Sequence, residues 1–152
     1  MNDIESAPEH THRVFDATEF PRVVDWVVQV ARREKYEALA GTGHSGLLVI
    51  GAACYILRIP AIAVRKDGDP VHAMYLTPVN TILPHADMRY AFVDDIIAAG
   101  RTLRRVVGQV RARAPDLILA GILLYARGAN APSYLLEEVG SDLDHCHYYQ
   151  PL

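Results

Sequence analysis

Cysteine is scarce in this chain, with only Cys54 and Cys146 among 152 residues. Two distant cysteines build neither a disulfide framework nor a four-thiolate zinc site. They are typical of a protein that is kept in a reducing compartment. We therefore expect a cytoplasmic location.

A basic surplus and long apolar runs are also lacking. The 15 basic and 18 acidic residues give a formal net charge of −3, whereas general nucleic-acid binding usually needs excess positive charge. The longest apolar run, 46–57, stops at Arg58 and is shorter than the roughly 20 residues of a membrane-spanning helix. No basic-then-apolar leader is visible at the N-terminus. We expect neither a nucleic acid nor a membrane as a partner.

The composition that is present fits one globular domain. Hydrophobic residues make up 51% of the chain and charged residues 22%, which is close to the globular average and supports a sizeable core. There is no internal repeat, low-complexity tract or long linker. We expect a single domain over 1–152, with 1–13 as a flexible tail.

Strands and helices are predicted to alternate along the chain. Apolar periodicity predicts helices at 21–37, 47–57, 100–113 and 132–139, and strands at 37–40, 61–64, 90–93, 117–125 and 147–149. The segment 71–88 contains two prolines and is the hardest to assign, with 74–76 and 81–83 as candidate short strands. The alternation predicts an α/β fold with a mostly parallel central sheet, in which ligands bind beyond the carboxyl ends of the strands.

The strongest motif is an apolar strand that runs directly into two adjacent acids, Asp94 and Asp95. A small-residue turn at 98–100 follows, and then the helix predicted at 100–113 begins. Adjacent carboxylates accept hydrogen bonds from sugar hydroxyls, and a small-residue turn at a helix start lets backbone N–H groups approach a phosphate. Asp-Asp alone is as typical of a strand-end turn and helix cap, with no ligand, as of a binding site. The whole pattern favours a ribose 5-phosphate site.

The segment 93–102, VDDIIAAGRT, resembles the phosphoribosyl pyrophosphate signature of type I phosphoribosyltransferases. The resemblance implies the fold of that family, with a small hood over its sheet. It also implies that Asp94 and Asp95 hold the ribose 2- and 3-hydroxyls. The 5-phosphate would then be held by Ala98, Ala99, Gly100, Arg101 and Thr102.

A glycine-rich segment, 41–46, precedes the predicted helix at 47–57. It matches the G-x-G-x-x-G fingerprint, which alone is weak evidence for a dinucleotide site. In a dinucleotide site an acid typically follows at the end of the next strand, but here Arg65 and Lys66 end that strand. Cations suit a phosphate better than a ribose diol, so the dinucleotide considered is the phosphorylated form, NADP. An NADP-binding oxidoreductase is therefore one alternative.

The same segment resembles the pyrophosphate loop of adenine-type phosphoribosyltransferases. Pyrophosphate needs both backbone N–H groups and cations. Arg65 and Lys66 would supply the cations. An exposed basic turn is the alternative for that pair. The loop residues implied to bind pyrophosphate are Thr42, Gly43, His44 and Ser45.

This chain departs from the family pattern at several positions. Ser45 replaces an arginine often found in the adenine-type loop, and position 98 is alanine rather than the general-base aspartate of hypoxanthine-type enzymes. The segment 67–88 contains no glutamate. We rank His72 first as a proton carrier there, although an exposed loop histidine is an equal alternative.

Together these features predict a phosphoribosyltransferase that joins phosphoribosyl pyrophosphate and a nucleobase, with a purine favoured. Mg²⁺ is expected on the pyrophosphate of the substrate. The resemblance implies a homodimer, with its contact from the helix at 21–37 or the loop at 71–88. A non-catalytic module that binds phosphoribosyl pyrophosphate or a nucleotide is the second alternative.

A metal held by the protein itself is not expected. Asp144, His145, Cys146 and His147 are adjacent, but on a strand His145 and His147 would share one face while Cys146 takes the other. Three zinc ligands would not converge from that arrangement.

Overall fold

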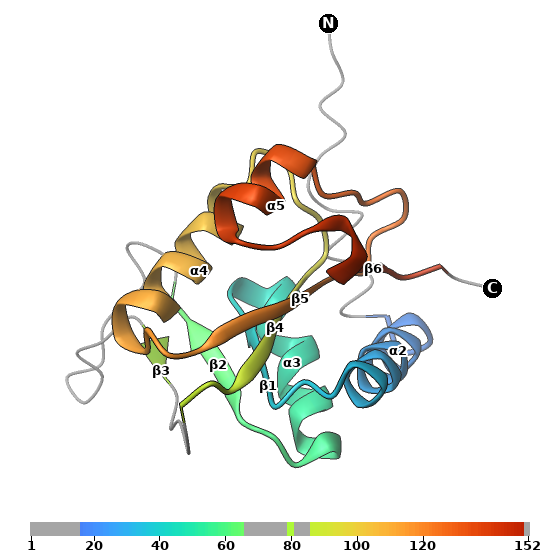
Figure 1. Ribbon diagram of the computed structural model, residues 1–152. Helices are drawn as coiled ribbons and strands as arrows, with labels where there is room; N and C mark the ends of the chain where they lie inside the picture. Colours follow the sequence, from blue (N-terminus) through green and yellow to red (C-terminus); the bar gives the residue numbers. More distant parts are fainter. Residues whose placement is uncertain (1–15, 66–78, 81–85, 151–152) are drawn as a thin grey trace, which may run out of the picture.

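The computed structural model describes residues 16–65, 79–80 and 86–150. Within them lies one sheet with the strand order β3-β2-β1-β4-β5-β6 (Figure 1). Its strands are β1 (Ala38–Gly41), β2 (Ala61–Val64), β3 (Val79–Asn80), β4 (Arg89–Asp94), β5 (Ile118–Leu124) and β6 (Cys146–Tyr148). All neighbours pair in parallel except β2 and β3, which are antiparallel. The predicted mostly parallel sheet is confirmed.

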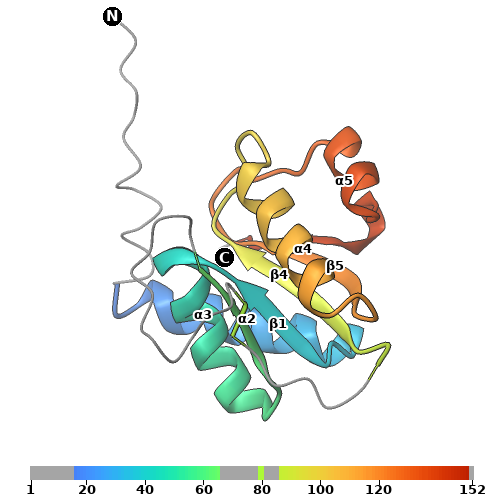
Figure 2. The same cartoon turned by 90° about the vertical axis from the view of Figure 1, so that its left-hand side faces the viewer.

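Helices cover both faces of this sheet. They are α2 (Glu19–Glu34), α3 (Gly43–Leu57), α4 (Arg101–Arg113) and α5 (Ser133–Val139), with a 3₁₀ turn η1 (Leu143–His145) before β6. Figure 2 shows α2 and α3 on one side of the strands and α4 and α5 on the other. A parallel sheet covered in this way is the predicted α/β architecture.

Strand β4 shows why the sheet is buried on both sides. Tyr90 and Phe92 belong to the core cluster that includes residues of α4 and α5, and Ala91 and Val93 belong to the cluster under α2 and α3. All four are at most 1% exposed. Because side chains alternate along a strand, an apolar side chain at every position gives β4 two buried faces.

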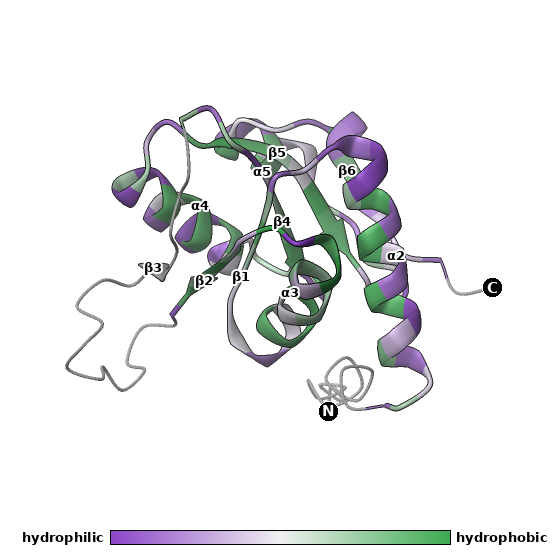
Figure 3. Cartoon of the chain, turned by 90° about the horizontal axis from the view of Figure 1, so that it is seen from below, coloured by the Kyte–Doolittle hydropathy of each residue, from purple (hydrophilic) through white to green (hydrophobic). Residues whose placement is uncertain are grey.

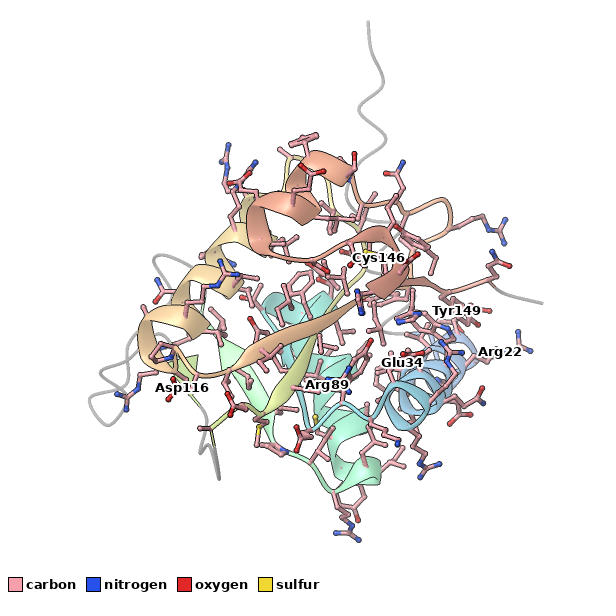
Figure 4. All side chains as sticks on the ribbon, viewed as in Figure 1. Arg22, Glu34, Arg89, Asp116, Cys146 and Tyr149 are labelled. Carbon is pink, nitrogen blue, oxygen red and sulfur yellow. The ribbon has the colours of Figure 1, made fainter. Side chains whose placement is uncertain are left out.

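Several element bounds differ from the sequence prediction. Helix α2 ends at Glu34 rather than 37, because Lys35 adopts a left-handed conformation (φ 58°) whose N–H caps the last carbonyls. Arg89 donates to the Glu34 carbonyl oxygen at 2.8 Å, which ties this helix end to the start of β4 (Figure 4). Helix α3 starts at Gly43 rather than 47. The candidate strands at 74–76 and 81–83 lie outside the described residues.

The cysteines and the length of the helices also bear on expectations from the sequence. Cys54 and Cys146 are free and buried. No helix in the described ranges is long and apolar enough to cross a membrane.

Candidate active site at the carboxyl edge of the sheet

The ends of β1 and β4 bring the two sequence motifs side by side. Ala40 pairs with Phe92 in the parallel register, so the chain leaves the sheet at Gly41 and at Asp94 along the same edge. The glycine-rich segment follows the first exit, and the small-residue turn follows the second. The structure therefore places both predicted anion loops at the carboxyl ends of adjacent strands, where α/β folds bind ligands.

Two glycines let these segments touch. A Cβ atom on Gly46 would lie 3.1 Å from the Val93 carbonyl oxygen and 3.2 Å from Gly41 Cα. A Cβ on Gly41 would lie 3.2 Å from the Gly46 backbone. These are closer than ordinary van der Waals contacts, so a side chain at either position would require the facing backbone to move by a few tenths of an ångström.

The first turn of α3 faces this edge. Thr42 is its N-cap and has an extended backbone, but its side chain makes no capping hydrogen bond. The N–H groups of a first helical turn have no acceptor within the helix, and the helix dipole favours negative charge there. Gly43, His44 and Ser45 form this turn. Its geometry suits the anion that the sequence predicts.

Asp94 is held in place by the turn of α3. Its side chain is 5% exposed, and its Oδ1 accepts hydrogen bonds from Ser45 Oγ at 2.8 Å and from the Asp95 N–H at 2.9 Å. The Ser45 carbonyl oxygen in turn accepts from the Tyr125 hydroxyl at 2.7 Å. The carboxylate that ends β4 is therefore fixed by residues from α3 and from the end of β5.

The pKa of Asp94 is raised from its ordinary value of 3.8 to about 7. Burial is the larger cause, and the negative charge of Asp95 is the second. The hydrogen bonds from Ser45 and from the Asp95 N–H act in the opposite direction. Hydroxyl donors from a sugar would favour the ionised form, so ligand binding at neutral pH would release a proton here.

Replacement of Asp94 by asparagine is expected to stabilise the fold above pH 7. The unfolded chain loses this proton near pH 4 and the folded chain near pH 7, so the wild type loses stability as pH rises across this window. The asparagine keeps an acceptor oxygen but removes the buried charge, and we expect it to raise the free energy of unfolding by about 2 kcal/mol at pH 8. Urea unfolding at pH 5 and pH 8 measures the difference.

The exposed Asp116→Asn variant is the matched control for that experiment, because it removes an acid from the opposite edge of the sheet. It should change stability by the same small amount at both pH values. Parallel pH profiles for wild type and Asp94→Asn would contradict the raised pKa.

The small-residue turn closes one side of a cavity. Ala98 and Ala99 are exposed, and Gly100 has a left-handed backbone (φ 76°) as the N-cap of α4. The cavity has a volume of about 380 Å³. Its wall is formed by Thr42, Ser45, Phe92 and the continuous segment 94–103. One cavity thus joins the acidic pair, the start of α3 and the small-residue turn.

The predicted site residues do not all reach this cavity. Thr42, Ser45, Asp94, Asp95, Ala98, Ala99, Gly100, Arg101 and Thr102 line it. Gly43 and His44 belong to the first turn of α3 without lining it, and the side chain of His44 is exposed. Arg65 follows β2 directly, at the same edge of the sheet, and is half-buried. Lys66 and His72 lie outside the described residues.

Sequence reasoning missed three residues that organise the site. Tyr125 supports Ser45, as described above. Arg104 donates to the Ala99 carbonyl oxygen at 2.9 Å and forms a two-pronged ion pair with Glu138 of α5. Arg105 donates to Thr42 Oγ1 at 3.3 Å. In the sequence, only the basic pair Arg104 and Arg105 indicated that cations lie near the small-residue turn. Their contacts depend on tertiary packing, which no local pattern shows.

The C-terminal segment is arranged differently from the prediction. His145 lies in the 3₁₀ turn η1 and contacts the Asp142 carboxylate, so the expectation that it shares a strand face with His147 was wrong. His147 lies 3.2 Å from the Tyr36 hydroxyl. Among the residues that the structure describes, no group of three His, Cys, Asp or Glu side chains is placed to hold a metal.

Comparisons with known proteins bear on the family and the fold of the chain. No protein-family profile matches the chain. The adenine phosphoribosyltransferase of Mycobacteroides abscessus is 33% identical over 121 residues, which cover 72% of this chain and 67% of that protein. The chain spans about two thirds of the length of the curated relatives that it matches.

Solved structures show the same fold. The adenine phosphoribosyltransferase of Thermoanaerobacter pseudethanolicus superposes with a TM-score of 0.63 at 20% identity, over 90% of this chain and 82% of that one. The orotate phosphoribosyltransferase of Aeropyrum pernix gives a TM-score of 0.62 at 20% identity, over 86% and 71%.

Proposed function

The chain belongs to the type I phosphoribosyltransferase family, whose members are pentosyl-transferring glycosyltransferases, and from this premise we propose the reaction that it performs. It transfers the 5-phosphoribosyl group of phosphoribosyl pyrophosphate to a nucleobase, which yields a nucleoside 5-monophosphate and pyrophosphate. The observation that carries the proposal is the acidic pair, Asp94 and Asp95, on the wall of a cavity that the segment 98–102 also lines. That cavity combines acceptors for a sugar with a cradle for its phosphate.

Each part of the site has a role in this reaction. Asp94 and Asp95 accept hydrogen bonds from the ribose hydroxyls, and their negative charge favours the positive charge that develops on the sugar. The backbone of 98–102 binds the 5-phosphate, while the first turn of α3 binds the departing pyrophosphate with help from Arg65 and Lys66. Most of the rate enhancement then comes from positioning and charge stabilisation rather than covalent chemistry.

A purine is the favoured acceptor. Three curated relatives are named adenine phosphoribosyltransferases, and the segment 41–46 resembles the pyrophosphate loop of adenine-type members. His72 remains a predicted proton carrier for the base. The cytoplasmic location and the absence of a nucleic-acid partner also remain predictions.

Magnesium is proposed as the metal of this reaction. Carboxylate oxygens of the kind at Asp94 and Asp95 are ligands that Mg²⁺ accepts, and Mg²⁺ keeps several waters when it binds phosphates. The acidic pair on the cavity wall therefore fits a Mg²⁺ that is held mainly by the pyrophosphate of the substrate. When bound, the ion neutralises charge on that leaving group.

Pyrophosphate release tests the proposal directly. The protein is incubated with phosphoribosyl pyrophosphate, Mg²⁺ and each of adenine, hypoxanthine, guanine and orotate. Release that requires a base, with adenine fastest, is the expected result. Binding without turnover would instead identify a non-catalytic module. Binding of NADP with no affinity for the sugar pyrophosphate would overturn both hypotheses.

We also propose that the protein forms a homodimer through α3. Figure 3 shows hydrophobic residues along this helix, and four of its large apolar residues are exposed. They are Leu47, Leu48, Tyr55 and Ile56, with exposed fractions of 36%, 41%, 73% and 45%. Exposed apolar patches of this kind are typical of interaction surfaces. By contrast, α2 shows alternating hydrophilic and hydrophobic bands in Figure 3, and its exposed residues are mostly polar, namely Arg22, Asp25, Gln29, Arg32 and Arg33.

Replacement of Leu48 by glutamate is expected to convert a dimer into a monomer. A charge placed in the apolar contact would be buried without a partner, which is strongly unfavourable. Light scattering after gel filtration measures the mass. Ile118→Glu is the matched control, because Ile118 is 46% exposed at the start of β5, outside α3. A monomeric wild type, or a Leu48→Glu variant that remains dimeric, would contradict the α3 interface.

A further inference from the structure

Arg105 reaches the pyrophosphate loop from the opposite side of the sheet. It lies in α4, whereas Thr42 is the N-cap of α3. Its Nη2 donates to Thr42 Oγ1 at 3.3 Å. Thr42 is 2% exposed and lines the cavity, so Arg105 places a guanidinium directly behind the wall of the site.

The positive charge of Arg105 has no acidic partner in the described part of the chain. The ion pairs found there do not include it. Its Nε is buried and has no hydrogen-bond partner among these residues. A buried donor without an acceptor is unfavourable, and more so when it carries charge. An anion in the neighbouring cavity would stabilise the positive charge of this guanidinium electrostatically.

Thr42 connects this charge to the cavity. Its hydroxyl oxygen accepts from Arg105, and its side chain makes no capping hydrogen bond to α3. The hydroxyl proton therefore has no acceptor among the described residues and is available to a ligand. A cation on the oxygen withdraws electron density and makes the O–H a stronger donor.

We infer that Arg105 is a positioning residue for pyrophosphate, acting through the Thr42 hydroxyl. This inference rests on the proposed function, since it assigns a residue to the pyrophosphate subsite of that same site. The position of Arg105 also accounts for a difference between this chain and the family pattern. The loop 41–46 has Ser45 where adenine-type members often have arginine, and its only basic residue is His44. Arg105 supplies from α4 the fixed positive charge that this loop lacks.

Binding of two ligands separates this role from a general structural one. Calorimetry measures the affinity of wild type and Arg105→Gln for Mg²⁺-pyrophosphate and for ribose 5-phosphate. We expect Arg105→Gln to weaken pyrophosphate binding about tenfold, the effect of ~1.4 kcal/mol, and to change ribose 5-phosphate binding less than about twofold. Arg113→Gln removes an equal charge from an exposed position of α4 and is the matched control.

A double-mutant cycle with Thr42→Val tests whether Arg105 acts through the hydroxyl. In the Thr42→Val background, Arg105→Gln should have little further effect on pyrophosphate affinity. Arg105→Lys retains the charge and should restore most of the affinity, and it also serves if Arg105→Gln does not fold. Equal effects on both ligands, or no effect on pyrophosphate, would overturn the inference. A wild type that binds neither ligand would instead refute the proposed function.

Discussion

Replacement of Asp95 by asparagine is expected to lower kcat/KM at least about 100-fold, because groups that stabilise developing charge in a transition state typically contribute factors of this size. Asp95 lies on the cavity wall, and its Oδ1 accepts from the Ile96 N–H at 2.7 Å. An asparagine keeps that acceptor but loses the charge opposite the sugar. The loss should fall mainly on kcat, since charge on the sugar develops only in the transition state.

The rate measurement needs two further variants for comparison. Asp116→Asn, at the opposite edge of the sheet (Figure 4), should keep the wild-type rate. Asp94→Asn should also lose activity, but together with the gain in stability described above. An Asp95→Asn enzyme whose rate stays within about threefold of wild type would remove the acidic pair from the mechanism.

Replacement of Gly100 by alanine is expected to lower the free energy of unfolding by about 3 kcal/mol. Two causes add. The backbone of Gly100 is left-handed, which alanine adopts only with strain. An added Cβ would also lie 2.5 Å from Leu135 Cδ2, and Leu135 is fully buried. Urea unfolding measures stability, and ribose 5-phosphate affinity should fall as the turn shifts.

Two variants separate these causes. Gly108→Ala, in the same helix, meets no atom within 4 Å and should stabilise the protein by about 0.5–1 kcal/mol through helix propensity. In a Leu135→Ala background the clash disappears, so Gly100→Ala should cost only the backbone strain, about 1–2 kcal/mol. A Gly100→Ala protein with wild-type stability would contradict the close packing of α5 on this turn.

The central strands could be predicted from sequence because they are continuously apolar. Strand β2 has the predicted bounds, Ala61–Val64, and β4 differs by one residue at each end. Strand β3 was missed, since a two-residue strand has no periodicity and depends on its partner β2. The start of α3 was placed too late because glycine has low helix propensity, which packing against β4 outweighs here.

The site was predictable where the chemistry is contiguous. Asp94, Asp95 and the turn 98–102 lie together on one cavity wall, as the sequence motif predicts. The contacts of Arg104, Arg105 and Tyr125 join residues from different layers of the fold. No local pattern encodes such pairs, so they required the structure.

The Ser45 side chain couples two parts of the site thermodynamically. Its hydroxyl binds Asp94, which would hold the sugar, while its own backbone belongs to the turn that would hold the leaving group. Any ligand that shifts this turn also shifts the proton affinity of Asp94, and by linkage the reverse is equally true. A leaving group that displaces Ser45 would therefore also change the affinity for the sugar, because the protonation of Asp94 depends on the Ser45 hydrogen bond.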